Sequence, residues 1–189
     1  MKVTEEPTVT YKVRSDVAGS SGWADITLRE WDGGGSFVCQ SDYGEFAYVW
    51  GSIGDQTLRE FLCGLDKQYF FAKVRTSDYM VYSHKRTIEC LKGEILRARK
   101  EQELDAEQAR ECWNAAKHID AMGTSEGIEF FNGVEESCLC ETLYQCDLSY
   151  VEIRQEYNPM CDMFWDRVWP HITKHWKEQL REDDTLPVR

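Results

Sequence analysis

The spacing of the apolar residues changes once along this chain, between residues 50 and 55. Up to residue 50 apolar and polar residues alternate, as they do around Ala24, Ile26 and Leu28, and this period of two is typical of strands with one buried face. Turn-forming residues interrupt the alternation, among them the three glycines at 33–35. The sequence therefore predicts an antiparallel β-meander of three to four strands within residues 8–50.

After residue 54 the apolar residues recur every three or four positions, which is the period of an amphipathic helix. The last helix is expected to begin at Asn158 and Pro159, because asparagine caps helices and proline is tolerated in the first turn. Pro170 should kink this helix or divide it in two. The predicted fold class is thus α+β, with the N-terminal meander packed against a C-terminal set of helices in residues 55–182.

Other parts of the chain give weaker patterns. Residues 67–82 are rich in aromatic side chains and fit either a helix or a strand, whereas residues 123–157 are expected to form short helices. The ends, residues 1–7 and 183–189, are expected to fray. The length suits one domain and no repeat or linker divides it, so residues 1–189 are predicted to form a single domain.

The composition indicates a folded protein that works inside a cell. Hydrophobic residues make up 42% of the chain and aromatic residues 13%, which excludes a disordered protein. No apolar run is long enough to span a bilayer, and the first residues lack the apolar stretch of a secretory signal. We therefore expect a cytoplasmic protein with no membrane partner. Its eight cysteines should be reduced thiols, because disulfides are rare in that compartment.

The net charge of -12 arises in the second half of the chain. Residues 101–166 contain 16 acidic and 3 basic residues, a balance that disfavours direct nucleic-acid binding because it repels phosphates. This stretch is either a solvated helical face that keeps the protein soluble or a surface that fits a basic partner, such as another protein's nucleic-acid-binding surface. On the second reading, the residues expected to bind the partner are Glu129, Glu135, Glu136, Glu141, Asp147 and Glu152.

Two histidines are the candidate metal ligands. His171 and His175 are four residues apart on the predicted last helix, so both imidazoles could reach one metal ion. The nearest candidates for a third ligand are Cys161 and Asp162, about two helical turns away. The alternative is that both histidines are partly exposed side chains with no ligand.

No other motif indicates catalysis. Cys138, Cys140 and Cys146 match no common zinc spacing, and the acidic residues around them should raise the thiol pKa values and disfavour a cysteine nucleophile. The glycines at 33–35 lack the lysine of a phosphate-binding loop and fit a hairpin turn. The sequence therefore favours a protein that is not an enzyme, and no cofactor is predicted.

Three segments carry a resemblance to a known group of proteins. SDYGEFAYVWGS at 41–52, LREFLCGLDKQYFFAKV at 58–74 and FWDRVWPHI at 164–172 resemble accessory proteins of tailed bacteriophages and prophages. The resemblance leaves out residues 1–20. No activity or catalytic residue is assigned in that group, so no residue role is carried over. The resemblance implies a protein of the bacterial host cytoplasm, and accessory proteins of this kind often inhibit host machines, including CRISPR and restriction systems.

Three functions follow as hypotheses. The first is a phage accessory protein that binds and inhibits a host protein, a component of antiviral defence, through the acidic helical surface. The second is a small metal-dependent enzyme that uses His171 and His175. The third is a structural phage protein that assembles with itself into a homo-oligomer through exposed aromatic side chains.

Overall fold

The structure, a computed structural model, describes residues 3, 5–15, 22–75 and 78–185. It confirms the predicted α+β class. The chain divides into two compact units: a sheet unit, Met1–Tyr79 with Tyr157–Arg189, and a helical unit, Met80–Glu156. Of the ends expected to fray, residues 1, 2, 4 and 186–189 lie outside the described residues. In the described part, no helix is both long and apolar enough to cross a membrane.

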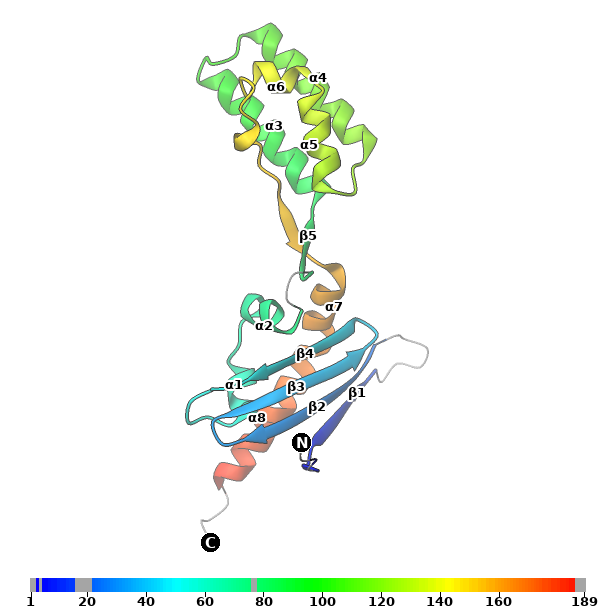
Figure 1. Cartoon of the computed structure of the whole chain (residues 1–189), viewed down its shortest axis with the longest axis vertical. Helices are drawn as coiled ribbons and strands as arrows, with labels where there is room; N and C mark the ends of the chain where they lie inside the picture. The colour runs from blue at the N-terminus through cyan, green and yellow to red at the C-terminus, as the bar shows by residue number, and fades with distance from the viewer. Residues whose placement is uncertain (1–2, 4, 16–21, 76–77, 186–189) are drawn as a thin grey trace. The chain divides into compact units, whose positions relative to one another are not determined.

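The sheet unit contains the predicted meander. Its four strands, β1 (Val9–Arg14), β2 (Trp23–Trp31), β3 (Gly34–Ser41) and β4 (Gly44–Trp50), pair antiparallel in chain order (Figure 1). Ile26 on β2 is opposite Tyr11 on β1 and Cys39 on β3, and Cys39 is opposite Phe46 on β4. Because alternate residues share a face, this register gathers the apolar side chains on one side of the sheet.

The hairpin between β2 and β3 forms where the glycines predict it, but only Gly33 lies in the turn. Gly33 has a φ of 72°, whereas Gly34 and Gly35 are buried strand residues. A Cβ atom on Gly34 would lie 2.5 Å from Nε1 of Trp31 and 2.7 Å from the carbonyl oxygen of Trp50. Gly34 is therefore required by close packing rather than by the turn.

Four helices belong to the sheet unit: α1 (Leu58–Cys63), α2 (Lys67–Val74), α7 (Pro159–Arg167) and α8 (Trp169–Thr185). α1 starts with a capping box, in which the hydroxyl of Thr57 accepts from the Glu60 N–H at 3.2 Å and the Glu60 carboxylate accepts from the Thr57 N–H at 2.7 Å. Pro159 occupies the first turn of α7 after the Asn158 cap, as predicted. The last helix is divided at Val168, and α8 runs three residues past the expected end.

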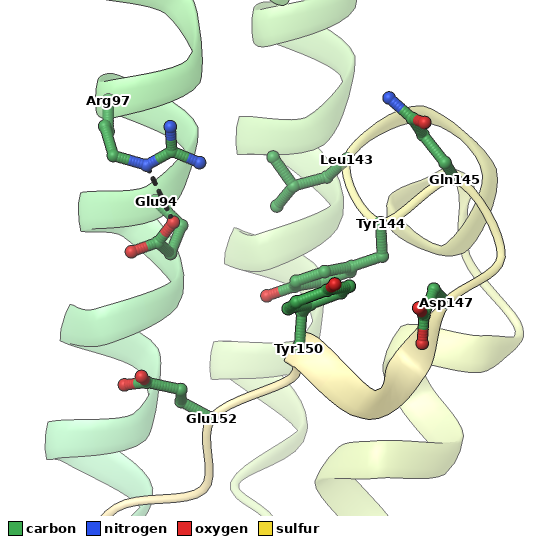
Figure 2. A pocket seen from close by; sticks show the side chains of 8 residues that line it. All are labelled: Glu94, Arg97, Leu143, Tyr144, Gln145, Asp147, Tyr150 and Glu152. Atoms are coloured by element: carbon green, nitrogen blue, oxygen red, sulfur yellow. Dashed lines mark hydrogen bonds and ion pairs between the residues drawn. The ribbon is translucent and has the colours of Figure 1, made fainter.

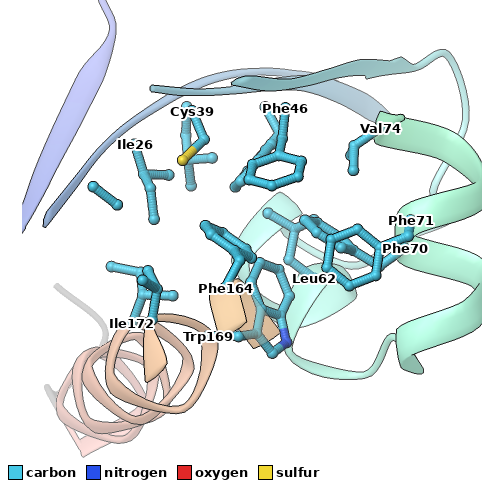
Figure 3. Close-up of a cluster of buried hydrophobic side chains, with 14 of the residues drawn as sticks. Ile26, Cys39, Phe46, Leu62, Phe70, Phe71, Val74, Phe164, Trp169 and Ile172 are labelled. Atoms are coloured by element: carbon cyan, nitrogen blue, oxygen red, sulfur yellow. The ribbon is translucent and has the colours of Figure 1, made fainter. Parts of the chain in front are cut away.

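The core of the sheet unit joins the inner face of the sheet to these helices (Figure 3). The ring centroids of Phe46 and Phe164 are 4.5 Å apart, and those of Phe70 and Trp169 are 4.3 Å apart. Such aromatic pairs add to the stabilisation that comes from burial. The strands at one end of the chain and the helices at the other therefore form one core.

The helical unit has a core of its own. Its elements are β5 (Met80–Tyr82), α3 (His84–Lys100), α4 (Ala106–Met122), α5 (Gly127–Glu135), α6 (Cys138–Thr142), the 3₁₀ helix η1 (Leu148–Tyr150) and β6 (Gln155–Tyr157), whose last residue already belongs to the sheet unit. Ile88, Leu91 and Ile95 of α3 pack with apolar residues of α4, α5 and α6. The short helices expected in residues 123–157 are present, but the two-stranded β5–β6 sheet was not predicted.

A substitution at Gly34 tests the packing of the sheet unit. We expect Gly34→Ala to lower the free energy of unfolding by about 2 kcal/mol, because overpacking moves neighbouring side chains and backbone. The matched control is Gly51→Ala, since a Cβ there meets no atom within 4 Å. Chemical denaturation of both variants measures the effect, and equal stabilities would show that the close approach around Gly34 can relax.

The single-domain prediction remains a prediction, and tryptophan fluorescence tests it. Six of the seven tryptophans lie in the sheet unit, and only Trp113 lies in the helical unit. The substitution Ile95→Ala weakens the core of the helical unit. If the chain is a single cooperative domain, the melting temperature measured by tryptophan fluorescence should fall as much as the melting temperature measured by the circular dichroism of the helices. A fluorescence transition that stays in place while the helical signal melts earlier would contradict one domain.

Candidate functional site

A pocket of about 570 Å³ lies in the helical unit (Figure 2). Glu94 and Arg97 on α3 form one wall, and residues after α6 form the other. The lining residues of that second wall are Leu143, Tyr144, Gln145, Asp147, Tyr150 and Glu152. Two of the six predicted acidic residues, Asp147 and Glu152, therefore meet at this pocket.

The second wall is built by an unusual turn after α6. Gln145 and Cys146 have φ angles of 50° and 65°, the left-handed region that non-glycine residues seldom adopt. The Cys146 N–H donates to the carbonyl oxygen of Cys140 at 2.8 Å, and the Asp147 N–H donates to that of Tyr144 at 2.8 Å. These bonds compensate a backbone strain of roughly 1 kcal/mol or more per residue, so the turn has a defined conformation.

The carboxylates of the pocket are held by their own neighbours. An oxygen of Glu94 accepts from Nε of Arg97 at 3.1 Å, and one of Asp147 accepts from the Ser149 N–H at 3.1 Å. Glu152 forms an ion pair with Arg154. In each case the bonds reach one oxygen, and no hydrogen bond or ion pair from the described residues reaches the other. The pocket is therefore lined by three carboxylates, each with one oxygen that has no partner among the described residues.

Tyr144 is the buried polar side chain of the pocket. Only 9% of its surface is exposed, and its hydroxyl, drawn in Figure 2, has no hydrogen-bond partner among the described residues. Burial, followed by the nearby charge of Glu94, raises the pKa of this hydroxyl to about 12. Tyr144 is therefore a neutral phenol at physiological pH, able to donate or to accept a hydrogen bond.

All six predicted acidic residues are exposed in the helical unit, but their surroundings differ. Glu129 belongs to the capping box of α5 and accepts from the Ser125 N–H at 2.8 Å, which lowers its pKa. Among the described residues, no hydrogen bond or ion pair reaches the carboxylates of Glu135, Glu136 and Glu141. Burial and then the neighbouring Cys146 raise the pKa of the Cys140 thiol, and the charges of Glu135 and Glu141 raise it further, so both carboxylates lie near this thiol.

The two histidines lie on α8 in the sheet unit, and both are exposed. The His175 ring packs against the Tyr11 ring with centroids 5.8 Å apart. Of the two suggested third ligands, Cys161 is fully buried and Asp162 forms an ion pair with Lys67. Among the residues that the structure describes, no three histidine, cysteine or acidic side chains are grouped so that they could hold a metal ion.

Several pocket residues escaped the sequence analysis. Glu94, Arg97, Tyr144 and Tyr150 meet because α3 packs beside a segment that follows about fifty residues later, and no local spacing encodes that contact. The only local signal was the charge pattern around Arg97, which pairs with Glu94 and Glu101 at helical spacing.

The chain was also compared with known proteins. The model of a phage family, Phage_phiTE_072, matches residues 1–178. This match includes residues 1–20, which the resemblance noted from the sequence had left out. No curated protein and no solved structure matches the chain.

The raised pKa of Tyr144 predicts a loss of stability in alkali. A tyrosine hydroxyl ionises near pH 10 in the unfolded chain, whereas the pKa of Tyr144 in the folded protein is about 12. The stability that the neutral hydroxyl contributes is therefore complete below pH 10 and is lost as the pH rises through 12. Between pH 9 and 11 we expect wild type to lose about 1 kcal/mol more unfolding free energy than Tyr144→Phe, which cannot ionise. Urea denaturation at both pH values measures this difference, and equal losses would contradict the raised pKa of Tyr144.

Proposed function

The chain belongs to the phage family whose model it matches, and from this premise we propose that it binds and inhibits a host protein through the acidic surface of its helical unit. The class of target that we propose is a component of antiviral defence, a CRISPR or restriction protein. The observation that carries the proposal is the group of exposed carboxylates without partners, Glu135, Glu136 and Glu141.

These three carboxylates differ from the paired charges of α3 and α4. Lys92 pairs with Asp120 at 2.7 Å, and Arg97 lies within 3.4 Å of the carboxylates of Glu94, Glu101 and Glu103. Carboxylates without an ion pair attract a basic surface and speed its association, and no existing pair competes for them. A surface of this kind supports binding to a protein whose own role is to bind nucleic acid.

Such binding would work by competition. A nucleic-acid-binding protein presents lysine and arginine side chains to phosphates, and the carboxylates of this surface would meet the same side chains. Occupying that surface inhibits the target without any chemical step, in keeping with the lack of a catalytic motif in the sequence. The interaction should weaken as salt is added, since exposed charges are screened.

Self-association is the second candidate. Val38 and Val49 are 47% and 60% exposed on neighbouring strands β3 and β4, and exposed apolar side chains of this kind can pack against a second copy of the chain. The mass of the purified protein in solution separates a homo-oligomer from a monomer that awaits a host partner.

Charge reversal tests the proposed surface. We expect Glu135→Lys, Glu136→Lys and Glu141→Lys, combined in one variant, to reduce capture of a host protein from bacterial extract at least about tenfold. The measurement is an affinity pull-down of the tagged chain at low and high salt, read by mass spectrometry.

The matched control is a triple reversal in the sheet unit, Asp32→Lys, Glu45→Lys and Asp55→Lys, at three exposed positions. It changes the net charge equally and should leave capture nearly unchanged. Equal recovery with the two variants would contradict a specific surface, and recovery of the chain alone would favour self-association.

A further inference from the structure

We propose that the pocket of the helical unit is a binding site for the guanidinium group of an arginine side chain. This proposal deepens the proposed function and rests on it for the source of the arginine, a basic host protein. The site itself is defined by the contacts within the pocket.

The first argument is the arrangement of the carboxylates. Glu94, Asp147 and Glu152 each use one oxygen for a neighbour in the helical unit and leave the other without a partner from the described residues. The bonds already made restrain these side chains, so a ligand has less conformational freedom to remove. Glu94 lies on the α3 wall of the pocket and Asp147 and Glu152 on the other (Figure 2), so a cation with several donors would find acceptors on both walls.

The second argument is the hydroxyl of Tyr144. This side chain is nine-tenths buried, lines the pocket and has no hydrogen-bond partner within the described part of the chain. The hydroxyl is not one of the fully buried, unpartnered polar atoms of the described residues, so it is open to the pocket, where water or a polar ligand can bond it. The hydroxyl therefore points to a polar ligand independently of the acidic residues.

The third argument separates arginine from lysine. Tyr150 also lines the pocket and is 70% exposed, so its ring is available for stacking. A guanidinium group is planar, stacks on aromatic rings and carries five N–H donors, which suit acceptors on two walls. An ammonium group has three donors on one atom, and it cannot stack.

The test uses a short blocked peptide, Gly-Arg-Gly, as the probe, with the full chain labelled for amide NMR. At low salt we expect the peptide to shift the amide signals of residues 143–152. The same peptide with citrulline in place of arginine, a neutral group of nearly equal shape, should cause no shifts, and the lysine peptide should bind at least about fivefold more weakly.

Variants of the site give the second readout. Asp147→Asn with Glu152→Gln should raise the Kd of the arginine peptide at least about tenfold, and asparagine preserves the cap of η1. Tyr144→Phe, which removes only the hydroxyl, should raise it about threefold. The control Glu135→Gln with Glu141→Gln makes the same charge change outside the pocket and should alter the Kd less than twofold. The amide spectra of the free variants report whether each is folded.

Three results would overturn the site: equal binding of the citrulline peptide, equal binding of the lysine peptide, or an equal loss of affinity in the control. These results are distinguishable from failure of the proposed function. If host capture needs Glu135, Glu136 and Glu141 but the arginine peptide does not bind, the pocket is excluded and the acidic surface remains. If the peptide binds but no host protein is captured, the pocket remains as a binding site and the proposed binding of a host protein is excluded.

Discussion

The sheet unit depends on aromatic packing between segments from opposite ends of the chain. Phe46 of β4 contacts Phe164 of α7, and Phe70 of α2 contacts Trp169 of α8. In the sequence, the helical unit lies between these partners. The core of the sheet unit therefore forms only when residues before position 80 meet residues after position 156. The Asn158 N–H donates to the carbonyl oxygen of Tyr79 at 2.8 Å, which joins the chain on either side of the insertion. Closing so long a loop costs conformational entropy, and an insertion that folds on its own reduces that cost.

The architecture could be predicted where one period extends over several residues. The alternation in β1 to β4 and the three- and four-residue spacing in α1 and α3 gave the correct element types, and Asn158 with Pro159 marked the start of α7. The division into two units gave no such signal. The chain passes from one unit to the other near residues 79 and 157, and neither place has a linker rich in glycine, proline or serine. Strands β5 and β6 have three residues each, too few to show a period.

The candidate site could be predicted only in part, because composition identifies charges but not their partners. The sequence indicated an acidic region and six of its residues. It could not show that Glu129 and Asp147 cap helices, that Glu152 pairs with Arg154, or that Glu135, Glu136 and Glu141 have no partner. The basic residues of α3 were counted with the first half of the chain, yet the fold places Lys92 and Arg97 against the acidic stretch.

The pairing of β5 with β6 has a consequence for how this family can change. The Ser83 N–H donates to the carbonyl oxygen of Arg154 at 2.9 Å, so the chain enters and leaves the helical unit at adjacent points. A segment whose ends meet is one that a domain can gain, exchange or lose at a single surface position. The helical unit, with its acidic face, can therefore be exchanged as one piece without interrupting the strand order β1 to β4.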